Sequence, residues 1–116
     1  SMVGFPYDDL DAWRAVYPVE VFIAQFKKVA RGFDQATAKL KEAIRSEQRK
    51  MLAAQRRALA EELSVAEAAA IHFHSTANQA RFVQARRALA AVKTGDDTKP
   101  FLGTLEGVMR EEIELA

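Results

Sequence analysis

The chain has 116 residues with 17 basic and 16 acidic side chains and no cysteine. A chain of this length forms one domain around one core, and a formal net charge of +1 provides no strong field to attract nucleic acid or an anionic membrane. The lack of cysteine excludes disulfides and thiolate chemistry, and no segment approaches the ~18 consecutive apolar residues of a membrane span. Abundant alanine with only 5 Gly and 3 Pro favours helix over sheet. We predict an all-α protein whose partners are neither nucleic acid nor membrane.

The first third of the chain predicts a short helix followed by a long one. The acidic pair before Leu10 can cap a short helix that carries Leu10 and Trp13, and Tyr17-Pro18 ends it because the residue before proline is disfavoured in the helical region. Residues 18–45 then predict an amphipathic helix. Its expected apolar seam, at alternating spacings of three and four, consists of Val19, Phe22, Phe26, Val29, Phe33, Ala36, Leu40 and Ala43.

The middle of the chain leaves open whether residues 18–63 form one helix or two. A break near Ser46 would give two, whereas one helix of about 45 residues would need a second copy to bury it. Ser64-Val65-Ala66-Glu67 has the capping-box pattern, so we expect another helix to begin there. That helix would run to about Val92 and lie antiparallel to the first long one. After a loop at 93–100 and a last helix from Phe101, the whole predicts an antiparallel three- to four-helix bundle with a short N-terminal helix.

The two ends of the chain indicate a single helical domain, residues 1–116, excised from a larger protein. Ser1, and with it Met2, is typical of a remnant of cloning. The closing Arg-Glu-Glu-Ile-Glu-Leu-Ala stops within an amphipathic pattern, without a glycine cap or a basic last turn. We therefore expect the last helix to continue in the parent protein.

The stretch "AIHFHSTANQARF", residues 70–82, gathers the polar groups that could carry chemistry. His72 and His74 point to nearly opposite sides of a helix, so they cannot share one metal ion. Ser75 lies in mid-helix and lacks the strained turn and oxyanion hole of a hydrolase nucleophile. We expect no catalytic residue, no metal and no cofactor.

His74, Asn78 and Arg81 form one polar line at i, i+4 and i+7. The line is either a set of hydrogen bonds between helices or a contact surface for another domain or a sugar. Periodicity places no constraint on Trp13 and Tyr17. These aromatic residues, with Phe5 and Tyr7, either staple the N-terminal segment over the bundle or offer flat faces to a sugar ring.

Two stretches, "WRAVYPVEVFIAQFKKVARGFDQATAKL" and "VAEAAAIHFHSTANQARFVQARRAL", together with the closing "REEIELA", resemble the C-terminal helical region of large bacterial proteins related to glycoside hydrolases. The shared motif is His-Phe-x-Ser-Thr-x-Asn-Gln-x-Arg-Phe, matched by His72, Phe73, Ser75, Thr76, Asn78, Gln79, Arg81 and Phe82. This chain has His74 where the family is expected to have a basic residue such as arginine. It has Ala70 where an aromatic residue is common. The resemblance implies a carbohydrate-active parent with a separate catalytic barrel, and an accessory role for this domain.

These observations predict a non-catalytic accessory module rather than an enzyme. Its partner would be a polysaccharide or the catalytic domain of the parent. The residues expected to make the contact are Trp13, Tyr17, His74, Asn78 and Arg81. The alternative is a structural domain that docks or self-associates without a ligand of its own, in which case we expect an exposed apolar patch or a homodimer that covers it.

Overall fold

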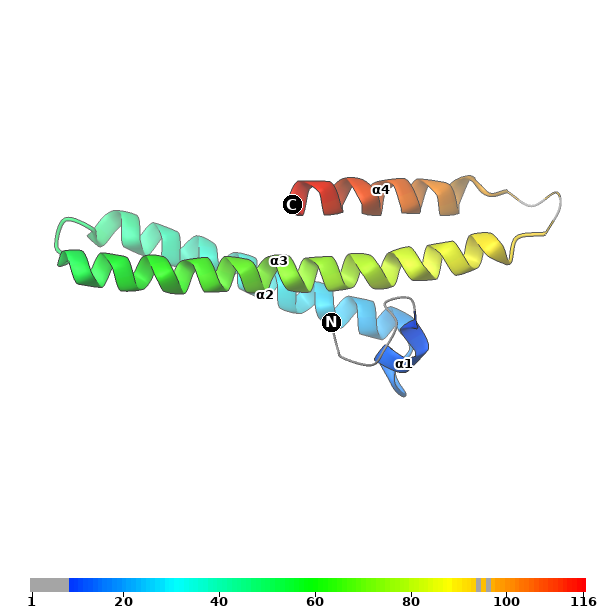
Figure 1. Cartoon of the computed structure of the whole chain (residues 1–116), viewed down its shortest axis with the longest axis horizontal. Coiled ribbons are helices and arrows are strands. Elements are labelled where there is room, and N and C mark those ends of the chain that lie inside the picture. Colours follow the sequence, from blue (N-terminus) through cyan, green and yellow to red (C-terminus); the bar gives the residue numbers. More distant parts are fainter. Residues whose placement is uncertain (1–8, 94, 96) are drawn as a thin grey trace.

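A computed structural model describes residues 9–93, 95 and 97–116. It contains α1 (Leu10–Arg14), α2 (Val19–Glu47), α3 (Ala53–Ala90) and α4 (Lys99–Leu115). The helices α2 and α3 form a long antiparallel hairpin, and α4 runs back along α3 (Figure 1). The predicted all-α bundle with a short N-terminal helix is confirmed, in an elongated molecule of 66 × 30 × 21 Å.

The short helix α1 is fixed at its start by a cap and by the burial of its first residue. Asp9 Oδ1 accepts a hydrogen bond from the Ala12 backbone N–H at 3.1 Å, as expected of an acidic N-cap. Leu10 is 2% exposed and packs in a cluster with Ile23, Ala80 and Val83. Because these three residues belong to α2 and α3, α1 packs against both helices of the hairpin near the N-terminus of α2.

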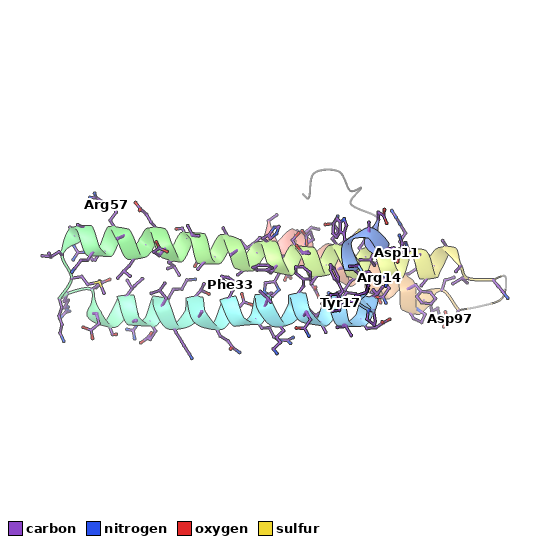
Figure 2. All side chains as sticks on the ribbon, turned by 90° about the horizontal axis from the view of Figure 1, so that it is seen from below. Asp11, Arg14, Tyr17, Phe33, Arg57 and Asp97 are labelled. Carbon is purple, nitrogen blue, oxygen red and sulfur yellow. The ribbon has the colours of Figure 1, made fainter. Side chains whose placement is uncertain are left out.

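The buried seam of α2 differs from the predicted one at alternate positions. Phe26, Phe33 and Leu40 are half-buried as predicted, and Phe33 lies between α2 and α3 (Figure 2), stacked on Phe73 with ring centroids 5.4 Å apart. The fully buried positions that alternate with them are Ile23, which precedes Phe26, and then Ala30 and Thr37. The predicted Val29, Ala36 and Ala43 are exposed. Both sets obey a spacing of three and four, so periodicity alone could not separate two seams that share their large side chains.

The structure resolves the alternatives left open for residues 18–63, with a break between α2 and α3 close to Ser46. Because α2 ends at Glu47 and α3 begins at Ala53, residues 18–63 belong to two helices. Arg56 Nη1 donates hydrogen bonds to the carbonyl oxygens of Met51 at 2.8 Å and Gln48 at 3.2 Å. A side chain of α3 therefore satisfies backbone acceptors that the turn leaves without helical partners.

The helix start predicted at Ser64 was wrong. The helix α3 passes through this position without interruption, and Ser64 Oγ donates to the Ala60 carbonyl oxygen at 3.0 Å. A capping serine needs free backbone N–H groups ahead of it. Residues 53–63 are already helical, so the hydroxyl bonds back to the preceding turn instead.

The last helix packs on α3 alone. Val108 is 3% exposed, and half-buried Phe101, Leu105 and Leu115 lie on the same side of α4. Nowhere do the Cα atoms of α2 and α4 approach within 8 Å. The two views place α1 and α4 on opposite sides of the hairpin (Figures 1 and 2). The helix α3 therefore forms the centre of the molecule, and its neighbours leave an open channel between α2 and α4.

Candidate functional site

The polar line on α3 joins that helix to both of its long neighbours. Toward α2, His74 Nε2 lies 2.6 Å from Asp34 Oδ2. Toward α4, Arg81 Nη1 donates to Glu111 Oε2 at 2.6 Å. The structure thus brings these predicted contact residues together and engages them in bonds between helices.

Asn78 is the buried centre of the line. It is 6% exposed, its Nδ2 donates to Glu112 Oε2 at 3.1 Å, and its Oδ1 accepts from Arg81 Nη1 at 3.2 Å. Ser75 Oγ donates to the other carboxylate oxygen of Glu112. Because a buried amide is costly unless it is hydrogen-bonded, this set fixes the position of α4 on α3.

A groove runs along α3 between α2 and α4. It consists of two adjoining hollows of about 510 and 490 Å³ that share Lys27 and Arg81. The floor is formed by α3 residues between His74 and Ala88, one wall by α2 residues from Glu20 to Arg31, and the other by α4 residues from Phe101 to Leu115. At ~1.5 Å per residue, the fourteen steps from His74 to Ala88 give a groove ~21 Å long.

Its walls carry opposite charges at the end near the C-terminus of α4. Lys27 and Arg31 extend from α2, while Glu111 and Glu114 extend from α4. Glu111 is paired with Arg81. Lys27, Arg31 and Glu114 have no ion-pair partner within the described part of the chain. Three uncompensated charges therefore face an open channel.

The two predicted aromatic contacts lie elsewhere. Trp13 is half-buried with its Nε1 atom buried, whereas Tyr17 is 59% exposed. Neither residue lines the groove, and α1, which carries Trp13, is on the side of the hairpin away from α4. Trp13 and Tyr17 therefore do not form one surface with the polar line. Phe5 and Tyr7, expected to assist them, lie outside the described residues.

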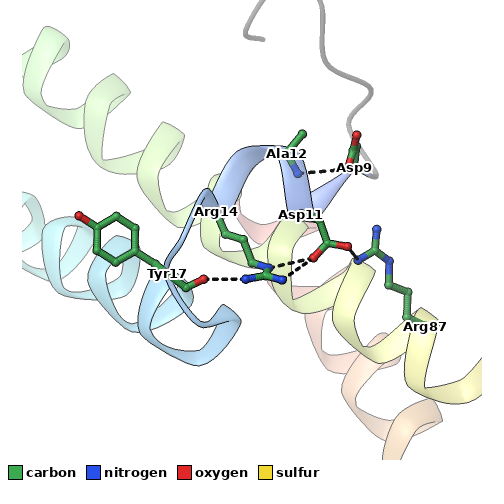
Figure 3. A network of polar contacts seen from close by, with 6 residues as sticks. All are labelled: Asp9, Asp11, Ala12, Arg14, Tyr17 and Arg87. Carbon is green, nitrogen blue, oxygen red and sulfur yellow. Dashed lines mark hydrogen bonds and ion pairs between the residues drawn. The ribbon is translucent and has the colours of Figure 1, made fainter.

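A separate ionic network attaches α1 to α3 (Figure 3). Asp11 Oδ1 accepts from Arg14 Nε at 2.9 Å, and Asp11 Oδ2 accepts from Arg87 Nη1 at 3.1 Å. The hydrogen bond from Arg14, followed by the positive charges of Arg14 and Arg87, lowers the pKa of Asp11 below its ordinary value of 3.8. Arg14 Nη1 also donates to the Tyr17 carbonyl oxygen at 3.0 Å, which ties the end of α1 to the start of α2.

Within residues 9–93, 95 and 97–116, no three His, Cys, Asp or Glu side chains converge as they would to hold a metal ion. No helix in these ranges has both the length and the apolarity to cross a membrane. Comparison with protein-family models, curated proteins and solved structures finds no match to this chain.

The sequence prediction missed the residues of the groove walls. Lys27 and Arg31 stand at i and i+4, so they share one face of α2, but such a pair usually lies on a solvated surface. Their position opposite Glu114 depends on the separation of α2 from α4, which no local pattern in the sequence encodes.

Proposed function

We propose that this chain is a non-catalytic helical docking module, and that its groove holds an amphipathic helix of another domain. The observation that carries the proposal is the open channel between α2 and α4, with uncompensated Lys27, Arg31 and Glu114 on its walls. Insertion of an amphipathic helix into a groove between helices is a recurrent mode of recognition.

The groove has the shape that a fourth helix needs. Both α2 and α4 run antiparallel to α3 (Figure 1), so they run in the same direction and a helix between them can lie antiparallel to both. A partner helix in this position completes a four-helix bundle, in which neighbouring helices pack at nearly antiparallel angles. The groove length of ~21 Å corresponds to about four helical turns.

The two basic side chains of the α2 wall, near its Arg31 end, specify the charge of the partner there. Lys27 and Arg31 lie on one face of α2, one turn apart, and therefore match two acidic side chains spaced i and i+4 on the partner helix. Complementary charges at an interface contribute mainly to specificity and to the rate of association. We therefore assign an acidic flank to the helix that binds here.

Two glycines on α4 support close approach of another helix. A glycine in a helix interior costs roughly 0.5–1 kcal/mol relative to alanine, and the spacing Gly103-x-x-x-Gly107 is typical of closely packed helices. A Cβ atom built at either position would have no neighbour within 4 Å. The intramolecular packing does not require these glycines, whereas a partner helix beside the α4 wall would use the space.

The resemblance described above adds a proposal about the parent. We propose that the module belongs to a carbohydrate-active protein whose catalytic domain supplies the acidic helix. Direct binding of a polysaccharide has less support. Sugar recognition favours a large aromatic face beside polar groups, yet Phe101 is the one Phe, Tyr or Trp side chain in the described lining of the groove.

Binding of designed peptides tests the docking proposal. Two helical peptides of about 18 residues, ~27 Å long, would share an apolar face and differ at one i, i+4 pair, which is Glu in the first and Lys in the second. By fluorescence anisotropy, the wild-type chain should bind the Glu peptide about tenfold more tightly. Lys27→Glu combined with Arg31→Glu should reverse that order.

The matched control is Lys28→Glu combined with Lys39→Glu, which changes the net charge equally at exposed positions of α2 outside the groove. It should retain the preference for the Glu peptide. Equal binding of the two peptides by all variants, or no binding, would overturn the proposal. Retardation by a polysaccharide in affinity electrophoresis that Arg81→Ala or Tyr17→Ala abolishes would replace it with a carbohydrate-binding function.

A further inference from the structure

We infer that the outer face of α4 is a dimer interface, where α4 pairs antiparallel with α4 of a second copy of the chain. Leu102, Met109 and Ile113 are 51%, 51% and 75% exposed. Their spacings of seven and four place them in one stripe, because a helix repeats every 3.6 residues. The stripe lies away from Val108, which is buried against α3.

The positions in the stripe are self-complementary under a twofold axis. We consider an antiparallel pair that sets Leu102 beside Ile113 of the second copy. In this register, two residues face each other when their numbers sum to 215. Glu106 then faces Met109 of the second copy, and the axis passes between Gly107 and Val108. Leu102 and Ile113, at the two ends of the stripe, thus contact each other twice, with the reciprocity that an isologous interface requires.

The same register also matches the charges. Glu106 and Arg110 form an ion pair within α4 at 2.7 Å, with side chains 62% and 74% exposed. In the dimer Arg110 stands level with residue 105 of the second copy, one residue from Glu106 of that copy. Two ion pairs can therefore form across the interface. This complementarity identifies a second copy as the occupant of the stripe.

A shallow hollow beside the stripe extends the surface. It has a volume of about 240 Å³, and apolar Met109, Val108 and Phe82 line it together with the polar side chains Ser75, Asn78, Gln79 and Glu112. No residue of α2 lines it, and it lies on the other side of buried Asn78, the one lining residue that it shares with the docking groove. The dimer therefore does not depend on the proposed function, and each can fail without the other.

Sedimentation velocity over micromolar to millimolar concentrations tests the interface. Wild-type chain should show a monomer–dimer equilibrium that Ile113→Glu weakens at least tenfold. Val65→Glu is the matched control, because Val65 is 67% exposed on the part of α3 that α4 does not cover, and it should change the dissociation constant less than about twofold. A wild-type chain that remains monomeric throughout would overturn the inference.

Charge exchange tests the register. Glu106→Arg and Arg110→Glu should each weaken the dimer several-fold because each sets like charges against each other, and the double variant should restore it. Since the chain contains no cysteine, Leu102→Cys and Ile113→Cys proteins can also be mixed and oxidised. The mixed disulfide should exceed both homodimers. Predominance of homodimers, or no restoration by the double variant, would contradict antiparallel pairing.

Discussion

Asn78 determines how firmly α4 is held on α3. Its side chain bonds to Glu112 on α4 and to Arg81 on its own helix, so replacement by alanine removes both of these hydrogen bonds. Loss of such a hydrogen-bonded group costs about 1–2 kcal/mol. We expect Asn78→Ala to lower the free energy of unfolding in urea by that amount.

The matched control for Asn78 is Gln25→Ala, which removes an exposed amide from α2. Surface substitutions of this kind usually change the free energy of unfolding by less than about 0.5 kcal/mol. Equal stability of the Asn78→Ala and Gln25→Ala variants would show that the polar line does not hold the helices together.

Asp11 makes the attachment of α1 sensitive to acid. The pKa of Asp11 is lowered in the folded chain, first by the hydrogen bond from Arg14 and then by the charges of Arg14 and Arg87. Its contribution is therefore present above the unfolded value of 3.8 and is lost as the pH falls through the lower folded value. We expect α1 to loosen over that acidic range, and the fluorescence of Trp13, the one tryptophan, reports it.

The Asp11→Asn variant should lack this acidic transition and show looser packing of Trp13 at neutral pH. Glu42→Gln serves as the control, since Glu42 binds Arg45 within α2 and lies far along the helix from α1. An unchanged fluorescence titration in Asp11→Asn would exclude the ionic network as the cause.

At the scale of elements, Ser64 distinguishes a helix interior from a helix start. Within α3 its hydroxyl bonds back to Ala60, and alanine is the better helix former by about 0.5 kcal/mol. Ser64→Ala should therefore leave the free energy of unfolding unchanged or raise it by up to that amount. A loss of about 1 kcal/mol, the usual effect of removing an N-cap, would indicate that a helix begins there after all.

The elements were predictable where one local signal dominates. The acidic cap before Leu10 and the long helix α2 each rest on neighbouring residues, and the structure agrees with them. The short helix ends at Arg14, before the predicted stop at Tyr17-Pro18. Ser64 was misread because a capping box and a helix interior share the same residues. Val29 was placed in the core because the large side chains of α2 fit two adjacent seams equally well.

At the scale of the whole molecule, stability should decline from the covered end of the hairpin to its tip. The described residues between 38 and 69 include no buried position, whereas α3 from Ala70 to Ala85 contains six. Local opening is easiest where few apolar contacts are lost. By hydrogen exchange, amides near residues 41–66 should exchange well before those of residues 70–85, and uniform protection would contradict this arrangement.

The groove is formed by three helices of the whole molecule together, and for that reason the sequence did not predict it. The polar line His74, Asn78 and Arg81 was visible as a helical pattern, and bonding between helices was one of its two interpretations. Lys27 and Glu114 are far apart in the chain, and they face one channel because α2 and α4 both pack on α3 without meeting. Only the arrangement of three helices makes these charges one site.

The measurement that tests the docking proposal most directly is a titration of ¹⁵N-labelled chain with the Glu peptide, followed by NMR chemical shifts. We predict that the largest changes fall on amides lining the groove, around Lys27 and Arg31 on α2, Arg81 on α3 and Glu114 on α4. Changes confined to α1 and Tyr17, to the hairpin tip or to the outer stripe of α4, with the groove amides unmoved, would contradict the proposal.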